Sequence, residues 1–191
     1  MKRLIFTIAA TVALMALVSP AAAQFVSSAS KDFLDAVRKA DIGTVQDLLR
    51  ERPTGLINAR ADDGNTALVM VIQRRDDDWT AFLLKSGADP DLPGKGGETP
   101  LIAAARAGSD SAVEWLLSLG AKADGTNRQG ETALIIAVQL REAAIVRPLL
   151  AAGANPDKAD HAQGYSARDY AARDTRGREI LKLITDKKPK P

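Results

Sequence analysis

The chain has 191 residues, with 26 Lys and Arg against 24 Asp and Glu, a single histidine and no cysteine. The lack of cysteine excludes a disulfide framework and a catalytic thiolate, and one histidine excludes a site built from several histidines. The near balance of charge argues against a general nucleic-acid binder, and no cofactor is expected.

The first 23 residues have the pattern of a secretory signal peptide. Lys2 and Arg3 form a short basic region, residues 4–18 are apolar and uncharged, and small residues precede a cleavage site after Ala23. The apolar run is about five residues short of a membrane span. We therefore expect a periplasmic or secreted protein with no membrane contact after cleavage. A retained N-terminal anchor is the alternative. Cleavage would leave 24 basic and 24 acidic residues.

Three consecutive segments, 65–97, 98–130 and 131–164, align with one another when the chain is shifted against itself, the last with one extra residue. Each segment has a threonine at its second position, followed later by a Leu-Leu pair and then by a Gly-Ala pair. These markers are Thr66, Thr99 and Thr132; the pairs starting at Leu83, Leu116 and Leu149; and Gly87, Gly120 and Gly153. Three markers that keep the same phase indicate a repeat array.

Each unit is predicted to contain two short helices. In the second unit Thr99 is a suitable N-cap, Pro100 suits the first helical position and Gly108 ends the helix. A second helix begins near Ser109 and ends at Gly120. The expected buried positions are Leu101, Ala104, Ala105, Val113, Leu116 and Leu117. Because one unit cannot bury its apolar face alone, the pattern predicts an all-α solenoid of stacked helix–turn–helix repeats with projecting polar loops.

The ends of the array are predicted to be caps. Residues 24–64 would contain a short linker and an N-terminal capping repeat, with Phe33, Leu34, Ala36 and Val37 in the core. Residues 165–186 would form a C-terminal capping repeat in which Arg168 replaces a buried leucine, and residues 187–191 a disordered tail. Pro148 is expected to kink the second helix of the third repeat or to delay its start.

The units resemble ankyrin repeats. The resemblance rests on Thr-Pro-Leu at 99–101, Leu-Leu-x-x-Gly-Ala at 116–121 and a period of about 33 residues, and it covers about residues 30–186. It implies non-catalytic protein–protein interaction through a concave face and loop tips. One departure is that Val69, Ile102 and Ile135 replace a histidine that links adjacent loops in the family. The loop network should therefore be weaker or be replaced by apolar contact.

Few residues suggest catalysis. Asp76–Asp78 could attract calcium, but their position before a helix favours capping. Gly94–Gly97 lacks the rest of a phosphate-binding loop and is interpreted as a turn. Trp79 and Trp115 are interpreted as packing residues, and His161 as an exposed loop residue. An enzyme or metal-dependent protein is an alternative of a different class, which metal-free activity of the purified chain would support.

The candidate binding residues come from the phase of the repeats. The predicted loop tips contain Asp62, Asp63, Lys95, Arg128, Gln129, His161 and Tyr165, and the inner helix positions contain Arg38, Lys39, Arg74 and Arg106. We expect Arg74 and Arg106 to occupy the same place in consecutive repeats and to form a basic groove for an acidic protein or peptide. The alternative is that these charges solubilise an exposed helix face.

The partner itself is unknown at this stage, and the protein is expected to be monomeric. One more specific role is a stress-protective or inhibitory factor for a single periplasmic enzyme. A neighbouring reading frame that encodes an exported enzyme would favour that role.

Overall fold

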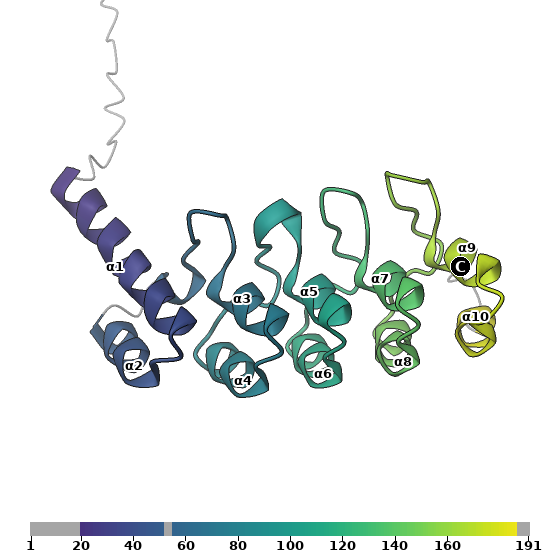
Figure 1. Ribbon diagram of the computed structural model, residues 1–191, viewed down its shortest axis with the longest axis horizontal. Helices are drawn as coiled ribbons and strands as arrows, with labels where there is room; N and C mark the ends of the chain where they lie inside the picture. The colour runs from purple at the N-terminus through teal and green to yellow at the C-terminus, as the bar shows by residue number, and fades with distance from the viewer. Residues whose placement is uncertain (1–19, 52–54, 187–191) are drawn as a thin grey trace, which may run out of the picture.

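The computed structural model describes residues 20–51 and 55–186. Most of the predicted signal peptide and the predicted tail lie outside these residues. Within them, ten α-helices form five consecutive pairs that stack side by side (Figure 1). The predicted all-α solenoid is therefore confirmed.

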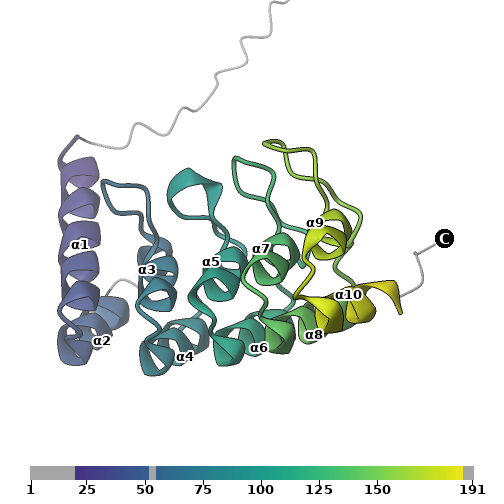
Figure 2. The same cartoon turned by 45° about the vertical axis from the view of Figure 1, so that its right-hand side comes forward.

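The pairs follow the order of the chain. They are α1 (Pro20–Arg38) with α2 (Ile42–Glu51), α3 (Ala67–Gln73) with α4 (Asp77–Lys85), α5 (Pro100–Ala107) with α6 (Asp110–Ser118), α7 (Ala133–Gln139) with α8 (Ala143–Ala151), and α9 (Ala167–Arg173) with α10 (Arg178–Thr185). Two short 3₁₀-helices, η1 (Leu56–Asn58) and η2 (Lys95–Gly97), lie in the loops. The first helices form one layer, the second helices form the other, and hairpin loops project beyond the first layer (Figure 2).

The helices begin and end for local reasons that the sequence predicts. The Thr99 hydroxyl accepts the Ile102 N–H at 3.2 Å, and Pro100 opens α5 without needing a hydrogen-bond acceptor. Gly108 ends α5 with φ of 65°, a left-handed conformation that glycine adopts without a steric penalty. Thr66, Thr132 and Ser166 cap α3, α7 and α9 in the same way.

The repeats on either side of Gly108 have arginine at the place that Gly108 holds. Arg75 and Arg141 have φ of 59° and 62°, so both carry a side chain in the left-handed region. Each side chain reaches the next repeat. Arg75 donates to the Gly108 carbonyl at 3.1 Å, and Arg141 donates twice to the Asp174 carboxylate, at 2.6 and 2.9 Å. These contacts tie successive turns together.

The core is continuous through the stack. Leu83, Leu116 and Leu149 hold equivalent positions and are each fully buried. Val69, Ile102 and Ile135 are also fully buried, so apolar packing fills the place of the family histidine, as expected. Leu117 was expected to be buried and is only half-buried, although Leu84 and Leu150 are buried at the same place in their repeats. The predicted core of the N-terminal cap is confirmed.

Two features differ from the expectations. α1 has 19 residues and begins at Pro20, so the expected linker after residue 24 is helical and the predicted cleavage point lies near the start of α1. α8 begins at Ala143, the same place in the repeat that Asp110 holds at the start of α6, so the expected late start at Pro148 is wrong. Pro148 lies inside α8 and has no N–H to donate to the carbonyl of Ala144, a residue that is exposed to solvent.

None of the helices within residues 20–51 and 55–186 combines the length and the apolar character that a membrane span needs.

Candidate functional site

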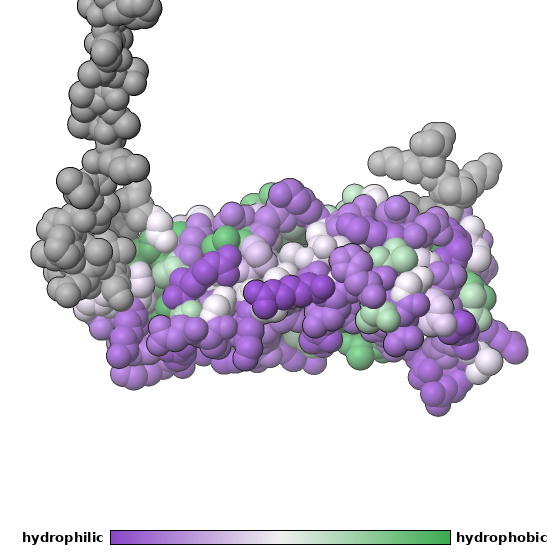
Figure 3. All heavy atoms as spheres, turned by 90° about the horizontal axis from the view of Figure 1, so that it is seen from above, coloured by the Kyte–Doolittle hydropathy of each residue, from purple (hydrophilic) through white to green (hydrophobic). Residues whose placement is uncertain are grey.

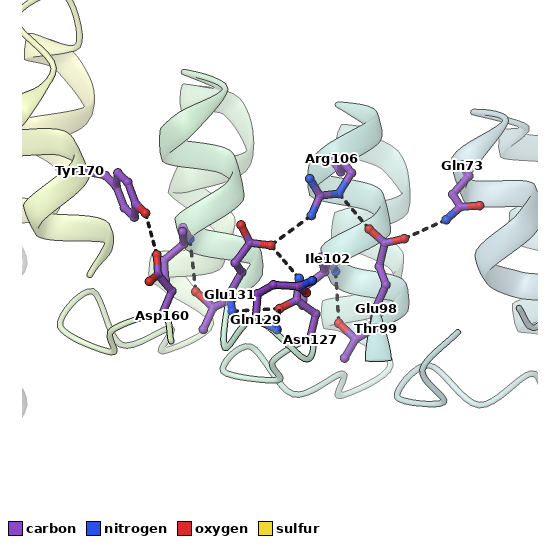
Figure 4. Close-up of polar contacts among 12 residues, drawn as sticks. Gln73, Glu98, Thr99, Ile102, Arg106, Asn127, Gln129, Glu131, Asp160 and Tyr170 are labelled. Carbon is purple, nitrogen blue, oxygen red and sulfur yellow. Dashed lines mark hydrogen bonds and ion pairs between the residues drawn. The ribbon is translucent and has the colours of Figure 1, made fainter. Parts of the chain in front are cut away.

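The first helices and the hairpins share one surface, here called the inner face: the hairpin residues 94–99, 127–132 and 160–166 together with the exposed sides of α3, α5, α7 and α9. A row of polar side chains crosses it from one repeat to the next (Figure 4). Gln73 donates to Glu98 at 2.8 Å, and Arg106 donates to Glu98 at 2.9 Å and to Glu131 at 3.4 Å. These four residues are called the inner strip.

The Asn127 side chain fixes Glu131 at one end of the inner strip. Its amide nitrogen donates to Glu131 Oε2 at 2.7 Å, and its oxygen accepts the backbone N–H of Gln129 and of Glu131, both at 3.0 Å. Asn127 is 9% exposed, so its amide is held inside the hairpin. The inner strip is therefore positioned from both the helix side and the loop side.

Asp160 organises the last hairpin, residues 160–166, which belongs to the repeat with the extra residue. It is 5% exposed; one oxygen accepts three backbone N–H groups, from residues 162, 163 and 164, at 2.7–3.1 Å, and the other accepts the Tyr170 hydroxyl at 2.6 Å. Burial alone raises the pKa of Asp160, but these hydrogen bonds outweigh it and hold the pKa below 3.8. The hydrogen bond from the Tyr170 hydroxyl to Asp160 raises the pKa of Tyr170.

Aromatic side chains and an exposed leucine lie at the C-terminal end of the inner face. The Tyr165 and Tyr170 rings meet edge to face at 5.6 Å, and the Arg173 guanidinium lies 3.8 Å from the centre of the Tyr165 ring. A surface hollow of about 320 Å³ opens between α7 and α9, beside Gln139, Tyr170 and Arg173. Leu140, next along the chain from Gln139, is 48% exposed.

The expected row formed by Arg74 and Arg106 is wrong. The separation of the two arginines is one residue short of the period, so Arg106 shares its place in the repeat with Gln73. The Arg74 guanidinium donates to the carbonyls of Val37 and Arg38 at 3.2–3.4 Å, where it caps the end of α1, and it lies 3.5 Å from Asp76.

The other predicted inner cations do not restore that row. Arg38 is paired with Asp35 at 2.9 Å, and Lys39 is exposed just beyond the end of α1. Arg106 lies between two carboxylates. The inner strip therefore alternates in charge, and it is not a basic groove.

The predicted loop-tip residues lie at the hairpin tips, except Tyr165, whose carbonyl accepts the Asp160 N–H at the base of its hairpin. Asp62, Asp63, Lys95, Arg128, Gln129 and His161 are all exposed, and Tyr165 is half-buried. Asp63 accepts the Asn65 N–H at 2.9 Å and so shapes its own hairpin. Sequence reasoning missed the roles of Gln73, Glu98, Asn127 and Asp160. Gln73 ends α3, and the other three lie in hairpins; their polar character was a signal, but each has a partner in a neighbouring repeat.

The acidic run before α4 has the capping role that its position predicts. Asp76 accepts the Trp79 N–H at 3.2 Å, and Asp77 accepts the Ser109 hydroxyl at 3.1 Å from the next repeat. Among the residues that the structure describes, no group of three or more His, Cys, Asp or Glu side chains is placed to hold a metal ion. Trp79 is buried against Phe82, with ring centres 5.5 Å apart, which confirms its packing role.

Comparison with known families agrees with the repeat phase. A family model of three ankyrin-repeat copies matches residues 33–127, and a model of the single ankyrin repeat matches residues 129–161. No curated protein matches the chain. Together the two models cover about two thirds of the sequence, from within α1 to beyond α8, and leave out the last helical pair. The chain therefore belongs to the ankyrin-repeat family.

Proposed function

We propose that this protein is exported and acts as a non-catalytic module that holds a protein partner on its inner face. Ankyrin-repeat domains are typically non-catalytic binding modules, and their partners are generally proteins. The predicted signal peptide supports export to the periplasm or the outside. The partner meets a surface built jointly by several repeats.

The inner strip is the observation that carries this proposal. Its side chains come from three successive repeat units and hold one another through hydrogen bonds of 2.8–3.4 Å. A surface fixed in this way loses little side-chain freedom on binding, which favours affinity. The chain neighbours of the exposed Leu140, Gln139 and Arg141, line the hollow, and Leu140 adds an apolar side chain that a partner can cover.

Leu140 allows a matched experiment. Leu140 and Leu119 are both C-cap residues of short helices and are 48% and 54% exposed; Leu140 follows α7 of the first layer, and Leu119 follows α6 of the second layer. Leu140→Gln and Leu119→Gln make the same chemical change at the same kind of position. We expect both variants to keep the stability of the parent.

The assay measures affinity for the protein that crosslinks to the parent in intact cells. Leu140→Gln should weaken the interaction with that purified partner about tenfold, whereas Leu119→Gln should leave it within about twofold, as expected for a hot-spot residue and a non-contacting residue. If Leu119→Gln weakens binding and Leu140→Gln does not, the partner binds the outer layer and the proposed site is wrong.

Export has its own test. Subcellular fractionation should place the protein in the periplasm or the medium, and N-terminal sequencing should begin at Gln24. An envelope-bound product that still begins at Met1 would contradict cleavage and would favour the retained anchor.

A further inference from the structure

One exposed basic side chain lies at the same place in each of three successive hairpins. Lys95, Arg128 and His161 follow one another at the period of the repeat, and all three are exposed. Among residues 20–51 and 55–186, the ion pairs with acidic side chains involve none of the three. Asp62 holds the corresponding place in the first hairpin. The three basic residues are called the tip row.

The backbone of each tip-row residue is fixed to the preceding hairpin. The N–H of Lys95 donates to Asn65 Oδ1 at 2.9 Å, that of Arg128 to the Gly96 carbonyl at 3.0 Å, and that of His161 to the Gln129 carbonyl at 2.7 Å. Adjacent hairpins are therefore joined, and the spacing of the tip row is set by the stack.

Glycine makes the close contact between the last two hairpins possible. A Cβ on Gly130 would lie 2.6 Å from the His161 ring and 2.9 Å from its backbone nitrogen, distances that would force the hairpins apart. Gly130 also has φ of 76°. The His161 ring consequently lies over Gly130, in line with the two basic residues before it.

The acidic side chains of these hairpins are held by partners on the first helices, and the basic ones are exposed. Glu98 and Glu131 pair with Arg106, and Asp160 binds Tyr170, so each carboxylate turns toward the first helices (Figure 4). The tip-row side chains are left at the solvent-exposed edge. The view onto the hairpins shows a mainly hydrophilic surface with scattered apolar residues (Figure 3).

We propose that the tip row binds an extended acidic segment of a protein that runs across the hairpins, at right angles to them. This inference rests on the proposed function and assigns the chemistry of one part of the partner. The partner places one carboxylate opposite each of Lys95, Arg128 and His161.

The spacing of the hairpins predicts the spacing of those carboxylates. Each hairpin contributes two chain segments and is hydrogen-bonded to the next, so equivalent residues lie about two inter-strand distances, or ~10 Å, apart. A segment in the polyproline II conformation has three residues per turn and rises about 3.1 Å per residue, so every third side chain returns to the same side about every 9 Å and comes opposite a basic side chain. The segment should therefore carry Asp or Glu at every third position.

The charge of the chain favours a protein over a nucleic acid as the partner. The chain is close to neutral, Asp62 and Asp63 lie at the end of the tip row, and the two formal cations Lys95 and Arg128 are few for tracking a phosphate backbone. A partner with carboxylates at intervals matches the separated cations better than a continuous polyanion does.

The test measures the binding of labelled peptides to the purified protein by fluorescence anisotropy at low and physiological salt. The probe is Glu-Ser-Ser repeated five times, and the comparison peptide has the same composition with its glutamates contiguous. The test variant is Lys95→Ser with Arg128→Ser. The control is Lys85→Ser with Lys182→Ser, which removes two exposed cations from α4 and α10.

We expect the test variant to bind the spaced peptide about tenfold more weakly than the parent, the control to stay within about twofold, and the parent's affinity to fall as salt rises. Circular dichroism establishes that both variants are folded. Unchanged binding by the test variant, an equal loss in the control, or equal affinity for the contiguous peptide or for single-stranded oligothymidine would overturn the inference.

One comparison separates this inference from the proposed function. If the cellular partner still binds the test variant and is lost by Leu140→Gln, the tip-row inference fails and the proposed function stands.

Discussion

Replacing Leu116 by alanine tests whether the helical phase is right. Leu116 is fully buried in α6, and α6 packs between α4 and α8. Leucine exceeds alanine by three carbon atoms, and about 0.8 kcal/mol is lost for each buried carbon removed, or roughly 2.4 kcal/mol in all. The cavity left behind adds to this loss, so we expect Leu116→Ala to lower the free energy of unfolding by about 3–5 kcal/mol.

Ser118 provides the control on the same helix. It is exposed, and its hydroxyl donates to the Trp115 carbonyl at 2.7 Å, a contact that water can replace. Ser118→Ala should change the free energy of unfolding by no more than about 0.5 kcal/mol. A step of two positions along α6 therefore separates a large effect from a negligible one.

The assay is urea unfolding at 25 °C, followed by far-ultraviolet circular dichroism and by tryptophan fluorescence. Coincident transitions would support a two-state analysis, which a stack of repeats can violate. Equal effects of the two substitutions, or a larger effect of Ser118→Ala, would refute the assignment of the buried stripe.

Three further predictions concern polar residues. Asp160→Asn should destabilise the protein at pH 7. The folded-state pKa of Asp160 lies below its ordinary value of 3.8, so the Asp160 carboxylate stabilises the fold above pH 3.8, and this stability is lost as the pH falls through the lowered pKa. Urea titrations of the parent and the variant should therefore converge in strong acid. Asp76→Ala should cost about 1 kcal/mol in urea unfolding through the lost N-cap of α4, and a cost near zero would mean that water replaces the cap. Arg106→Gln should change the free energy of unfolding by less than about 1 kcal/mol, because its side chain is 49% exposed, and a larger loss would show that the inner strip stabilises the stack.

The sequence was sufficient to predict the stack, because its signals are local and repeated. The caps at Thr99 and Ser109, the left-handed turn at Gly108 and the burial of Leu116 depend on neighbours within one unit and on the period. The threonine caps and the buried leucines occur in all three repeats, so their shared phase excludes chance agreement, whereas glycine holds the left-handed turn after the first helix only at Gly108.

The inner face could be predicted only in part. Long side chains reach several ångströms from their backbone, and the direction that they take depends on acceptors in another repeat. Arg74 binds carbonyls of α1, and Arg106 finds two carboxylates from two hairpins. The sequence alone shows that Arg74 and Arg106 do not hold the same place in the repeat, because their separation along the chain is one residue short of the period. The extra residue of the third repeat is visible in the sequence, whereas the hydrogen bonds that Asp160 makes to the backbone of that hairpin can be seen only in the folded structure.

The most direct test of the account is photo-crosslinking in intact cells from single defined positions. A photoreactive residue replaces Gln139 on the inner face or Lys85 on the outer layer, both of which are exposed. The account predicts a discrete adduct with one partner protein from position 139 and none from position 85. An adduct from position 85 alone, or the same adduct from both positions, would contradict binding on the inner face.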